Sequence, residues 1–176
     1  TSCGTGEYLG FEKKKIRLKG ERVSILKELT ANDVAEKKSS TEIILEDTAR
    51  SRNFSAKLYF PNLSSKETSI PVVVISHGLG SNGVTFERLA QHLASYGFAV
   101  ALPQHRGSNY EYVQKFLAGK TQEIFQGNEF IDRPLDISFL LNELEQLNKY
   151  QFHDQLNLEK VGIFGHSFGA STAFAL

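Results

Sequence analysis

Residues that could do chemistry lie at the ends of three apolar stretches of this sequence. Polar residues and glycines follow directly after each stretch, at Ser76–Gly80, Pro103–Gly107 and Gly165–Gly169. The third reads Gly-His-Ser-Phe-Gly, a G-x-S-x-G pattern that is typical of a serine nucleophile on a sharp turn between a strand and a helix. Because such a turn strains the backbone, its neighbours must be small, and the glycines supply that room. We therefore predict that Ser167 is the nucleophile of an acyl-transfer reaction.

Acyl transfer also requires hydrogen-bond donors for the oxyanion of its tetrahedral intermediate. The backbone N–H of Phe168, the residue after the serine, is the first donor that the pattern predicts. The second donor should come from the turn after an earlier strand, and we assign it to Leu79, with Gly78 as the alternative. The competing interpretation is structural: a tight glycine turn with an incidental serine at one strand end, and a plain strand-to-helix turn at the other.

The histidines fit supporting roles. We expect His77 to hydrogen-bond the backbone of its turn and His166 to pack beside the serine turn. His105 follows a strand on the side where open α/β sheets bind ligands, so a role in a substrate pocket stays open for it. His92 and His153 fit surface positions.

The charged residues near the predicted helix starts also have structural interpretations. Asp132 and Asp136 fit a helix start better than a catalytic carboxylate pair, and Arg133 could anchor its loop to the sheet by ion pairing. No cluster of residues has the spacing of metal ligands, so we expect neither a metal nor an organic cofactor.

Apolar patterns predict the elements that position these residues. Continuous apolar runs, typical of strands buried on both faces of a parallel sheet, occupy Pro71–Ser76, Phe98–Leu102 and Val161–Phe164. Helical spacing follows each run: the first helix is predicted over Phe86–Ala94, and the last begins at about Phe168. The helix between them is predicted to start with a cap at Asp132, to hold Pro134 in its first turn and to continue to Leu144. A shorter helix is predicted around Glu111–Leu117. Strand–helix repeats predict an α/β fold with a mostly parallel sheet, helices on both faces and right-handed crossovers.

Two further strands precede these repeats. Ile43–Leu45 and the alternating stretch Phe54–Phe60 predict an antiparallel pair at the edge of the sheet. Upstream, only a short strand at Ile16–Lys19 and a brief helix capped by Ser24 are indicated. We interpret residues 1–40 as an N-terminal extension or linker and residues 41–176 as the amino-terminal part of a catalytic domain.

Composition narrows the function classes. A chain of 176 residues with 40% apolar and 23% charged residues predicts a globular domain rather than a disordered one. Lys and Arg together number 20, and so do Asp and Glu. The chain therefore has no excess of positive charge that would indicate binding to nucleic acid or anionic lipid. The apolar runs are too short to span a membrane, and the single Cys3 excludes an internal disulfide. The chain lacks methionine and a secretory signal, so we expect a processed or cut piece; compartment and oligomeric state are not indicated.

Four stretches together resemble the α/β-hydrolases related to platelet-activating-factor acetylhydrolase, and most closely the bacterial proteins labelled predicted dienelactone hydrolases. They are Val74–Ser81, Leu93–Val100, Glu129–Asp136 and Gly165–Gly169. The resemblance begins near Phe54 and implies an α/β-hydrolase fold that is truncated after the nucleophile turn. Two departures are visible: dienelactone hydrolases carry a cysteine nucleophile where this chain has Ser167, and Ala170 stands where many relatives have a second glycine.

In this fold the triad acid and histidine follow the serine along the chain. Phe168–Leu176 supplies neither, so we expect both to lie beyond Leu176 and the 176-residue piece to be inactive alone.

The complete protein is interpreted as a serine esterase that forms an acyl-enzyme at Ser167 with a small-molecule ester. The alternative is a catalytically silent α/β-hydrolase-like binding module. A nucleotide-binding protein is disfavoured, since no G-x-x-x-x-G-K-[ST] or G-x-G-x-x-G motif follows a strand. Finally, the Ser76–Ser81 and Gly165–Gly169 turns should lie side by side, because both must face one oxyanion.

Overall fold

The computed structural model describes residues 40–61, 69–119 and 128–176. The strand and helix predicted within residues 16–29, and with them most of the predicted N-terminal extension, lie outside the described residues. In chain order the elements are β1 (Ser40–Asp47), the 3-10 turn η1 (Thr48–Arg50), β2 (Arg52–Tyr59), β3 (Ile70–Ser76), the 3-10 turn η2 (Gly83–Phe86), α2 (Glu87–Ser95), β4 (Ala99–Pro103), α3 (Tyr110–Leu117), α4 (Glu129–Tyr150), β5 (Leu156–Gly165) and α5 (Phe168–Phe174).

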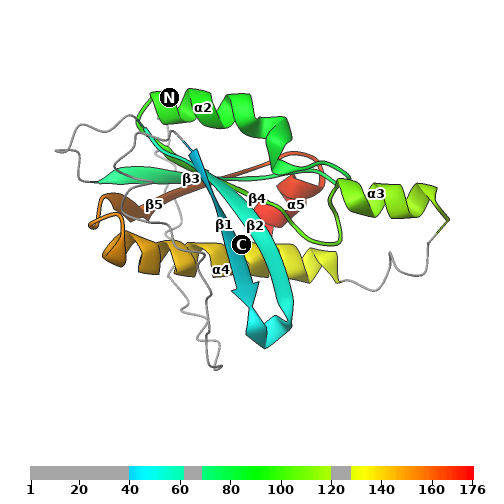
Figure 1. Ribbon diagram of the computed structural model, residues 1–176. Helices are drawn as coiled ribbons and strands as arrows, with labels where there is room; N and C mark the ends of the chain where they lie inside the picture. Colours follow the sequence, from blue (N-terminus) through cyan, green and yellow to red (C-terminus); the bar gives the residue numbers. More distant parts are fainter. Residues whose placement is uncertain (1–39, 62–68, 120–127) are drawn as a thin grey trace, which may run out of the picture.

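These strands form one mixed sheet in the order β1-β2-β4-β3-β5. Strands β4, β3 and β5 are parallel to one another, whereas β2 pairs antiparallel with both β4 and β1. This arrangement confirms the predicted α/β fold with an antiparallel pair at one edge. Figure 1 shows α2 over one face of the sheet and α4 with α5 on the opposite face, while α3 projects from one end.

Alternating side chains of the central strands fill two apolar cores. On β3, Val72 and Val74 pack into the core that α4 completes, where Ile137 and Leu140 of that helix are fully buried. Ile75 faces the other way, into a second core beneath α2 that contains Ala90, Ala94, Val100 and Leu102. The period of two along a strand thus explains why the continuous apolar runs serve helices on both faces.

Helix α4 begins earlier than the sequence pattern indicated. It starts at Glu129 and not after a cap at Asp132, so Pro134 lies in the second turn rather than the first. The carbonyl of Asn128 accepts hydrogen bonds from the N–H groups of both Ile131 and Asp132, and no side chain caps this end. The carboxylate of Asp132 instead lies within ion-pair distance of two arginines, which is why it is not available as a cap.

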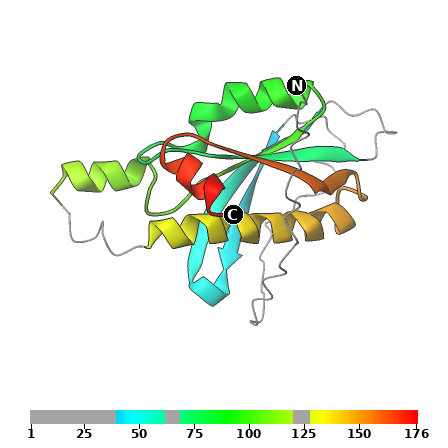
Figure 2. The ribbon, with the colours of Figure 1, turned by 180° about the vertical axis from the view of Figure 1, so that it is seen from behind.

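The last strand and helix carry the serine turn. Strand β5 is longer than predicted, since it begins at Leu156, and it forms an edge of the described sheet. Seen from behind, in Figure 2, β5 leads directly into α5, which lies over the amino-terminal half of α4. No helix in the described part of the chain combines the length and apolarity needed to cross a membrane.

Candidate active site

Ser167 occupies the turn between β5 and α5 in a strained conformation. Its φ of 53° and ψ of −120° lie in a region that residues with a side chain rarely adopt, and its side chain is exposed. Strain of this kind places the hydroxyl of a nucleophile above the end of the sheet. The structure therefore confirms the strand–turn–helix geometry that the G-x-S-x-G pattern predicted, while the catalytic role of Ser167 stays a prediction.

Steric contacts explain both glycines of the motif. A Cβ atom at Gly165 would lie 2.0 Å from the carbonyl oxygen of Gly169, and a Cβ atom at Gly169 would lie 2.0 Å from the carbonyl oxygen of Ser76. Because the opposing atoms belong to the backbone, neither clash could be relieved by a change of rotamer. These close approaches bring the serine turn against the end of β3.

The two predicted turns lie side by side. Ser76 pairs with Gly165 across β3 and β5, and the N–H of His166 donates to the carbonyl of Ser76 over 3.2 Å. A Cβ atom at Gly78 would lie 3.3 Å from the Cβ atom of Ser167. The turn that contains Leu79 therefore faces the serine, as predicted.

The two proposed oxyanion donors have free N–H groups. Within residues 40–61, 69–119 and 128–176, no acceptor is hydrogen-bonded to the N–H of Leu79 or of Phe168. The N–H groups that follow them are both used: Gly80 donates to the carbonyl of Ser108 and Gly169 to that of His166, each over 2.8 Å. The N–H groups of Leu79 and Phe168 thus remain open to a ligand, and so does that of Gly78, the alternative donor, among the described residues.

No general base of the described chain contacts the serine. None of the side chains that the structure describes is hydrogen-bonded to Ser167 Oγ. His166 is exposed, and its ring packs against that of Phe86 with a centroid distance of 6.1 Å, in agreement with its predicted place beside the turn. In the same described ranges, no group of three or more His, Cys, Asp or Glu residues is arranged to hold a metal ion.

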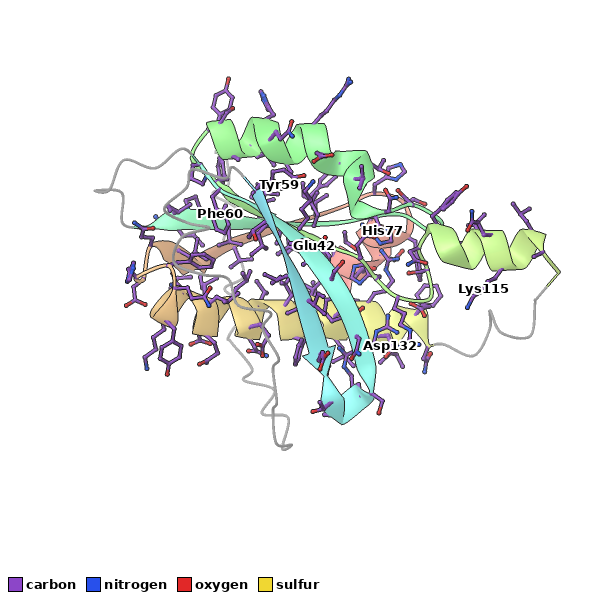
Figure 3. All side chains as sticks on the ribbon, viewed as in Figure 1. Glu42, Tyr59, Phe60, His77, Lys115 and Asp132 are labelled. Atoms are coloured by element: carbon purple, nitrogen blue, oxygen red, sulfur yellow. The ribbon has the colours of Figure 1, made fainter. Side chains whose placement is uncertain are left out.

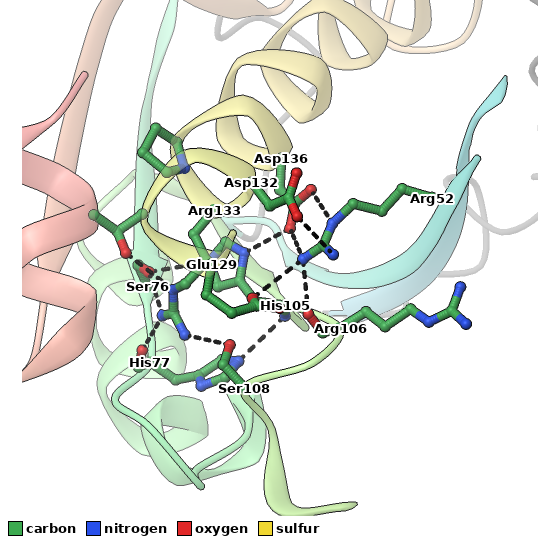
Figure 4. A network of polar contacts seen from close by, with 12 residues as sticks. Arg52, Ser76, His77, His105, Arg106, Ser108, Glu129, Asp132, Arg133 and Asp136 are labelled. Atoms are coloured by element: carbon green, nitrogen blue, oxygen red, sulfur yellow. Dashed lines mark hydrogen bonds and ion pairs between the residues drawn. The ribbon is translucent and has the colours of Figure 1, made fainter. Parts of the chain in front are cut away.

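Behind the turns lies a buried polar network, shown in Figure 4. His77 has no exposed surface. Its Nδ1 lies 2.8 Å from the carbonyl oxygen of Gly78, and its Nε2 accepts a hydrogen bond from the N–H of His105 over 3.2 Å. These partners require the tautomer with the proton on Nδ1. Burial lowers the pKa of His77 to about 4. The prediction that His77 hydrogen-bonds the backbone of its turn is confirmed.

His105 lies in this network and not in a substrate pocket. The residue is fully buried, with Nε2 3.0 Å from Ser76 Oγ and Nδ1 3.0 Å from Asp136 Oδ2. Burial lowers the pKa of His105 to about 4, so its ring is neutral at physiological pH. The pocket role that the sequence left open for His105 was wrong, because a side chain without exposed surface cannot line a pocket.

Ser76, His105 and Asp136 make the atom-to-atom contacts of a Ser-His-Asp triad. All three residues have no exposed surface, however, and Ser76 Oγ also accepts a hydrogen bond from Arg133 Nη2 over 3.0 Å. An ester carbonyl cannot reach a hydroxyl that is enclosed in this way. These contacts are therefore a structural arrangement beneath the turns.

Asp136 is the anionic centre of the network. Arg52 donates to it from Nε over 2.8 Å and from Nη2 over 3.0 Å, and Arg50 Nη2 lies 3.1 Å away. Although burial opposes the charge, hydrogen bonds from His105 and Arg52 hold the pKa of the Asp136 carboxyl below its usual value. The helix-start role predicted for Asp136 was therefore wrong, because the residue lies beyond the first turn of α4 and its carboxylate joins this helix to β2 and to the loop after β4.

Arg133 was expected to anchor its loop by ion pairing, and it does so by hydrogen bonds instead. Its guanidinium is fully buried and donates to oxygens of Ser76, His77, Ser108 and Thr172. None of the ion pairs between described residues involves Arg133. Burial lowers its pKa to about 10, which still leaves it charged at neutral pH.

Sequence reasoning missed that these residues form one network. The signal was present, since Arg133 continues the spacing of Ile137, Leu140 and Leu144 and so lies on the buried face of α4. A charged residue at a core position of a helix needs several partners nearby. Figure 3 shows His77 and Asp132 at the end of the molecule from which α3 projects, where these segments meet.

Comparisons with known proteins agree with this architecture. Residues 71–176 match the family model described as the alpha/beta hydrolase fold. Platelet-activating factor acetylhydrolase of Canis lupus familiaris is 27% identical over 136 residues, a match that covers 58% of this chain and 30% of that protein. The Bos taurus protein of the same name is 24% identical, with the same coverage of 58% and 30%. The chain thus spans about a third of the length of the curated relatives it matches.

Solved structures show the same fold. The ferulic acid esterase from Streptomyces cinnamoneus superposes with a TM-score of 0.55 at 18% identity, covering 77% of this chain and 53% of the esterase. A dienelactone hydrolase-like promiscuous phosphotriesterase from metagenomic libraries superposes with a TM-score of 0.51 at 16% identity, covering 78% and 54%. Together with the family match over more than half of the sequence, these findings show that the chain belongs to the α/β-hydrolase family.

Proposed function

We propose that this chain carries the nucleophile and the oxyanion hole of a serine hydrolase that acts on carboxylic esters. The observation that supports this most strongly is the exposed, strained Ser167, which faces a turn whose Leu79 N–H group is free. The names of the relatives agree with ester chemistry, since they include acetylhydrolases and a ferulic acid esterase.

The chemistry follows from the positions of these groups. Ser167 Oγ attacks the carbonyl carbon of the ester, and its proton passes to a general base. The negative oxygen of the tetrahedral intermediate accepts hydrogen bonds from the N–H groups of Leu79 and Phe168. The ester C–O bond then breaks, the alcohol leaves with the proton that the base returns, and the acyl group stays on Ser167. Water, deprotonated by the same base, hydrolyses this acyl-enzyme and regenerates the hydroxyl.

The general base and its orienting acid have to come from elsewhere than the described residues. No described side chain is hydrogen-bonded to Ser167 Oγ, and the buried His77 and His105 are committed to other partners. We therefore propose that the histidine and the acid of the triad follow Leu176 in the full-length protein, as the chain order of this family implies. On this proposal, the 176-residue piece alone lacks a means of activating its serine.

Covalent labelling tests the assignment in the full-length protein. A fluorophosphonate should form an adduct on the peptide that contains Ser167, and Ser167→Ala should abolish both labelling and hydrolysis of a short-chain chromogenic ester. The buried Ser76 serves as an internal control, because it should stay unlabelled in the folded protein. Adduct formation on Ser76, or normal turnover by Ser167→Ala, would contradict the proposal. A wild-type protein with neither labelling nor turnover would instead support the silent binding module.

A further inference from the structure

The guanidinium of Arg133 lies between the two turns that form the proposed site. Its Nε donates to Thr172 Oγ1 over 2.9 Å, and its Nη1 donates to Ser108 Oγ over 2.7 Å. Its Nη2 donates to Ser76 Oγ over 3.0 Å and to the carbonyl oxygen of His77. All three nitrogens are therefore occupied by oxygens of segments that are far apart in the sequence.

On one side these contacts fix the turn that contains Leu79. The carbonyl of His77, two residues before Leu79 in this turn, is held by Arg133 directly. The N–H of Gly80, which follows Leu79, donates over 2.8 Å to the carbonyl of Ser108, whose hydroxyl is held by Arg133 as well. The backbone is thus restrained before and after the N–H group of Leu79.

On the other side they fix the beginning of α5. Thr172 Oγ1, the acceptor for Arg133 Nε, donates in turn to the carbonyl of Phe168 over 3.0 Å. The guanidinium carbon also lies 4.7 Å from the centroid of the Phe168 ring, within the range of a cation–π contact. Phe130, on the first turn of α4, packs edge-on against that ring at 4.8 Å.

The geometry points to Arg133 as a positioning residue that sets the spacing between the N–H groups of Leu79 and Phe168. This inference rests on the proposed function, and it adds a residue that contacts neither substrate nor nucleophile. A guanidinium is a planar group whose donors keep fixed relative directions, so it can hold two backbone segments at one separation. Burying a guanidinium among neutral oxygens costs free energy, because the charge loses its hydration. The four hydrogen bonds that Arg133 donates offset part of this cost.

A lysine at this position could not reproduce the arrangement. Its single ammonium nitrogen presents donors from one point, whereas Thr172 and Ser108 are bound by different guanidinium nitrogens. Arg133→Lys should therefore keep the charge and lose the spacing. Since oxyanion donors act mainly in the transition state, an altered spacing should lower kcat more than it changes KM.

The test uses the full-length protein and an ester substrate. Arg133→Lys should lower kcat about ten- to hundredfold, while KM stays within about twofold. The inhibition constant of an alkyl trifluoromethyl ketone, which adds to the serine as a tetrahedral oxyanion, should rise by the same factor by which kcat falls. A purely structural role would lower thermal stability without this match between the two factors.

Arg52→Lys is the matched control, because Arg52 belongs to the same buried network but contacts neither turn. It should lower the melting temperature and leave kcat within about twofold. Thr172→Val provides a second variant in case Arg133→Lys does not fold, since it removes the hydrogen bonds of Thr172 Oγ1 to Arg133 and to the carbonyl of Phe168, leaves the contacts of Arg133 with the Leu79 turn in place and keeps the branched shape. It should lower kcat in the same direction by a smaller factor.

Two results would overturn the inference. One is a folded Arg133→Lys or Thr172→Val protein whose kcat and ketone inhibition constant are unchanged; the other is an equal loss of kcat in Arg52→Lys. Failure of the proposed function itself gives a different result, namely turnover that survives Ser167→Ala. In that case the oxyanion hole assigned to Leu79 and Phe168 is wrong, whatever Arg133→Lys does.

Discussion

The backbone of Ser167 is held in its strained conformation by two glycines that approach other backbone atoms closely. At Gly169 the space for a side chain is filled by the carbonyl of Ser76, and at Gly165 it is filled by Gly169 itself. Sequence alone predicted this turn, because the need for small neighbours is a local property that a five-residue motif expresses. It could not predict the contacts of His105 or Asp136, which join residues 31 positions apart in the chain.

A substitution at Gly169 tests this steric account. In Gly169→Ala the new Cβ would lie 2.0 Å from the carbonyl oxygen of Ser76, so β3 and α5 must separate. We expect the free energy of unfolding to fall by about 3 kcal/mol or more, with loss of esterase activity. Gly162→Ala on β5 is the control: its Cβ would meet Val73 at an ordinary 3.9 Å, and its stability should change by less than about 0.5 kcal/mol. Equal urea midpoints for the two variants would contradict this explanation.

At the scale of elements, apolar patterning predicted the strands and the buried face of α4. These features depend on periodicity, which a single sequence shows directly. The start of α4 was predicted four residues too late, because the preference of aspartate for a cap position was applied to Asp132, whereas the cap position is Asn128. Tertiary contacts override that preference here, since the carboxylate of Asp132 lies near Arg50 and Arg52 of the β1–β2 hairpin.

The link between α4 and the hairpin is carried mainly by Asp136. Asp136→Asn should lower the free energy of unfolding by about 3 kcal/mol, because it leaves the largely buried Arg52 without its nearest anionic partner and removes one of the carboxylates paired with Arg50. Asp132→Asn is the matched control, since its ion pairs are longer, at 3.5 and 3.7 Å, and its side chain is 27% exposed. We expect it to change stability by less than about 1 kcal/mol. Urea denaturation of both variants measures the difference, and similar losses would show that Asp136 is not the dominant link.

At the scale of the whole molecule, the order β1-β2-β4-β3-β5 places the ends of β3 and β5 next to each other. Sequence reasoning predicted that the two turns meet because a shared oxyanion requires it, but no local pattern specifies the strand order. The same arrangement encloses His77 and His105 behind the turns, with no exposed surface on either. Burial of two histidines links the stability of the entire fold to pH.

Both histidines bind protons more weakly in the folded state than in the unfolded state. Burial lowers the pKa of each from 6.5 to about 4. Between these values the two histidines bind protons in the unfolded chain that they do not bind in the folded protein, so their contribution to the free energy of unfolding falls as the pH falls. The stabilisation is complete above about pH 6.5 and is lost progressively towards pH 4, with a slope of at most about 1.4 kcal/mol per pH unit for each histidine. Asp136, whose pKa is lowered from 3.8, acts in the same direction at still lower pH.

Urea denaturation at several pH values between about 4.5 and 7 measures this slope. His105→Gln should reduce the slope by about half, because one of the two buried titrating rings is removed while the other remains. His92→Gln is the control for loss of a histidine as such, since His92 is exposed on α2, and it should leave the slope as in the wild type. A stability that is flat over this range, or a slope unchanged in His105→Gln, would show that the His105 ring titrates in the folded protein much as it does in the unfolded chain. The description of His105 as a neutral ring that bridges Ser76 and Asp136 beneath the turns would then be wrong.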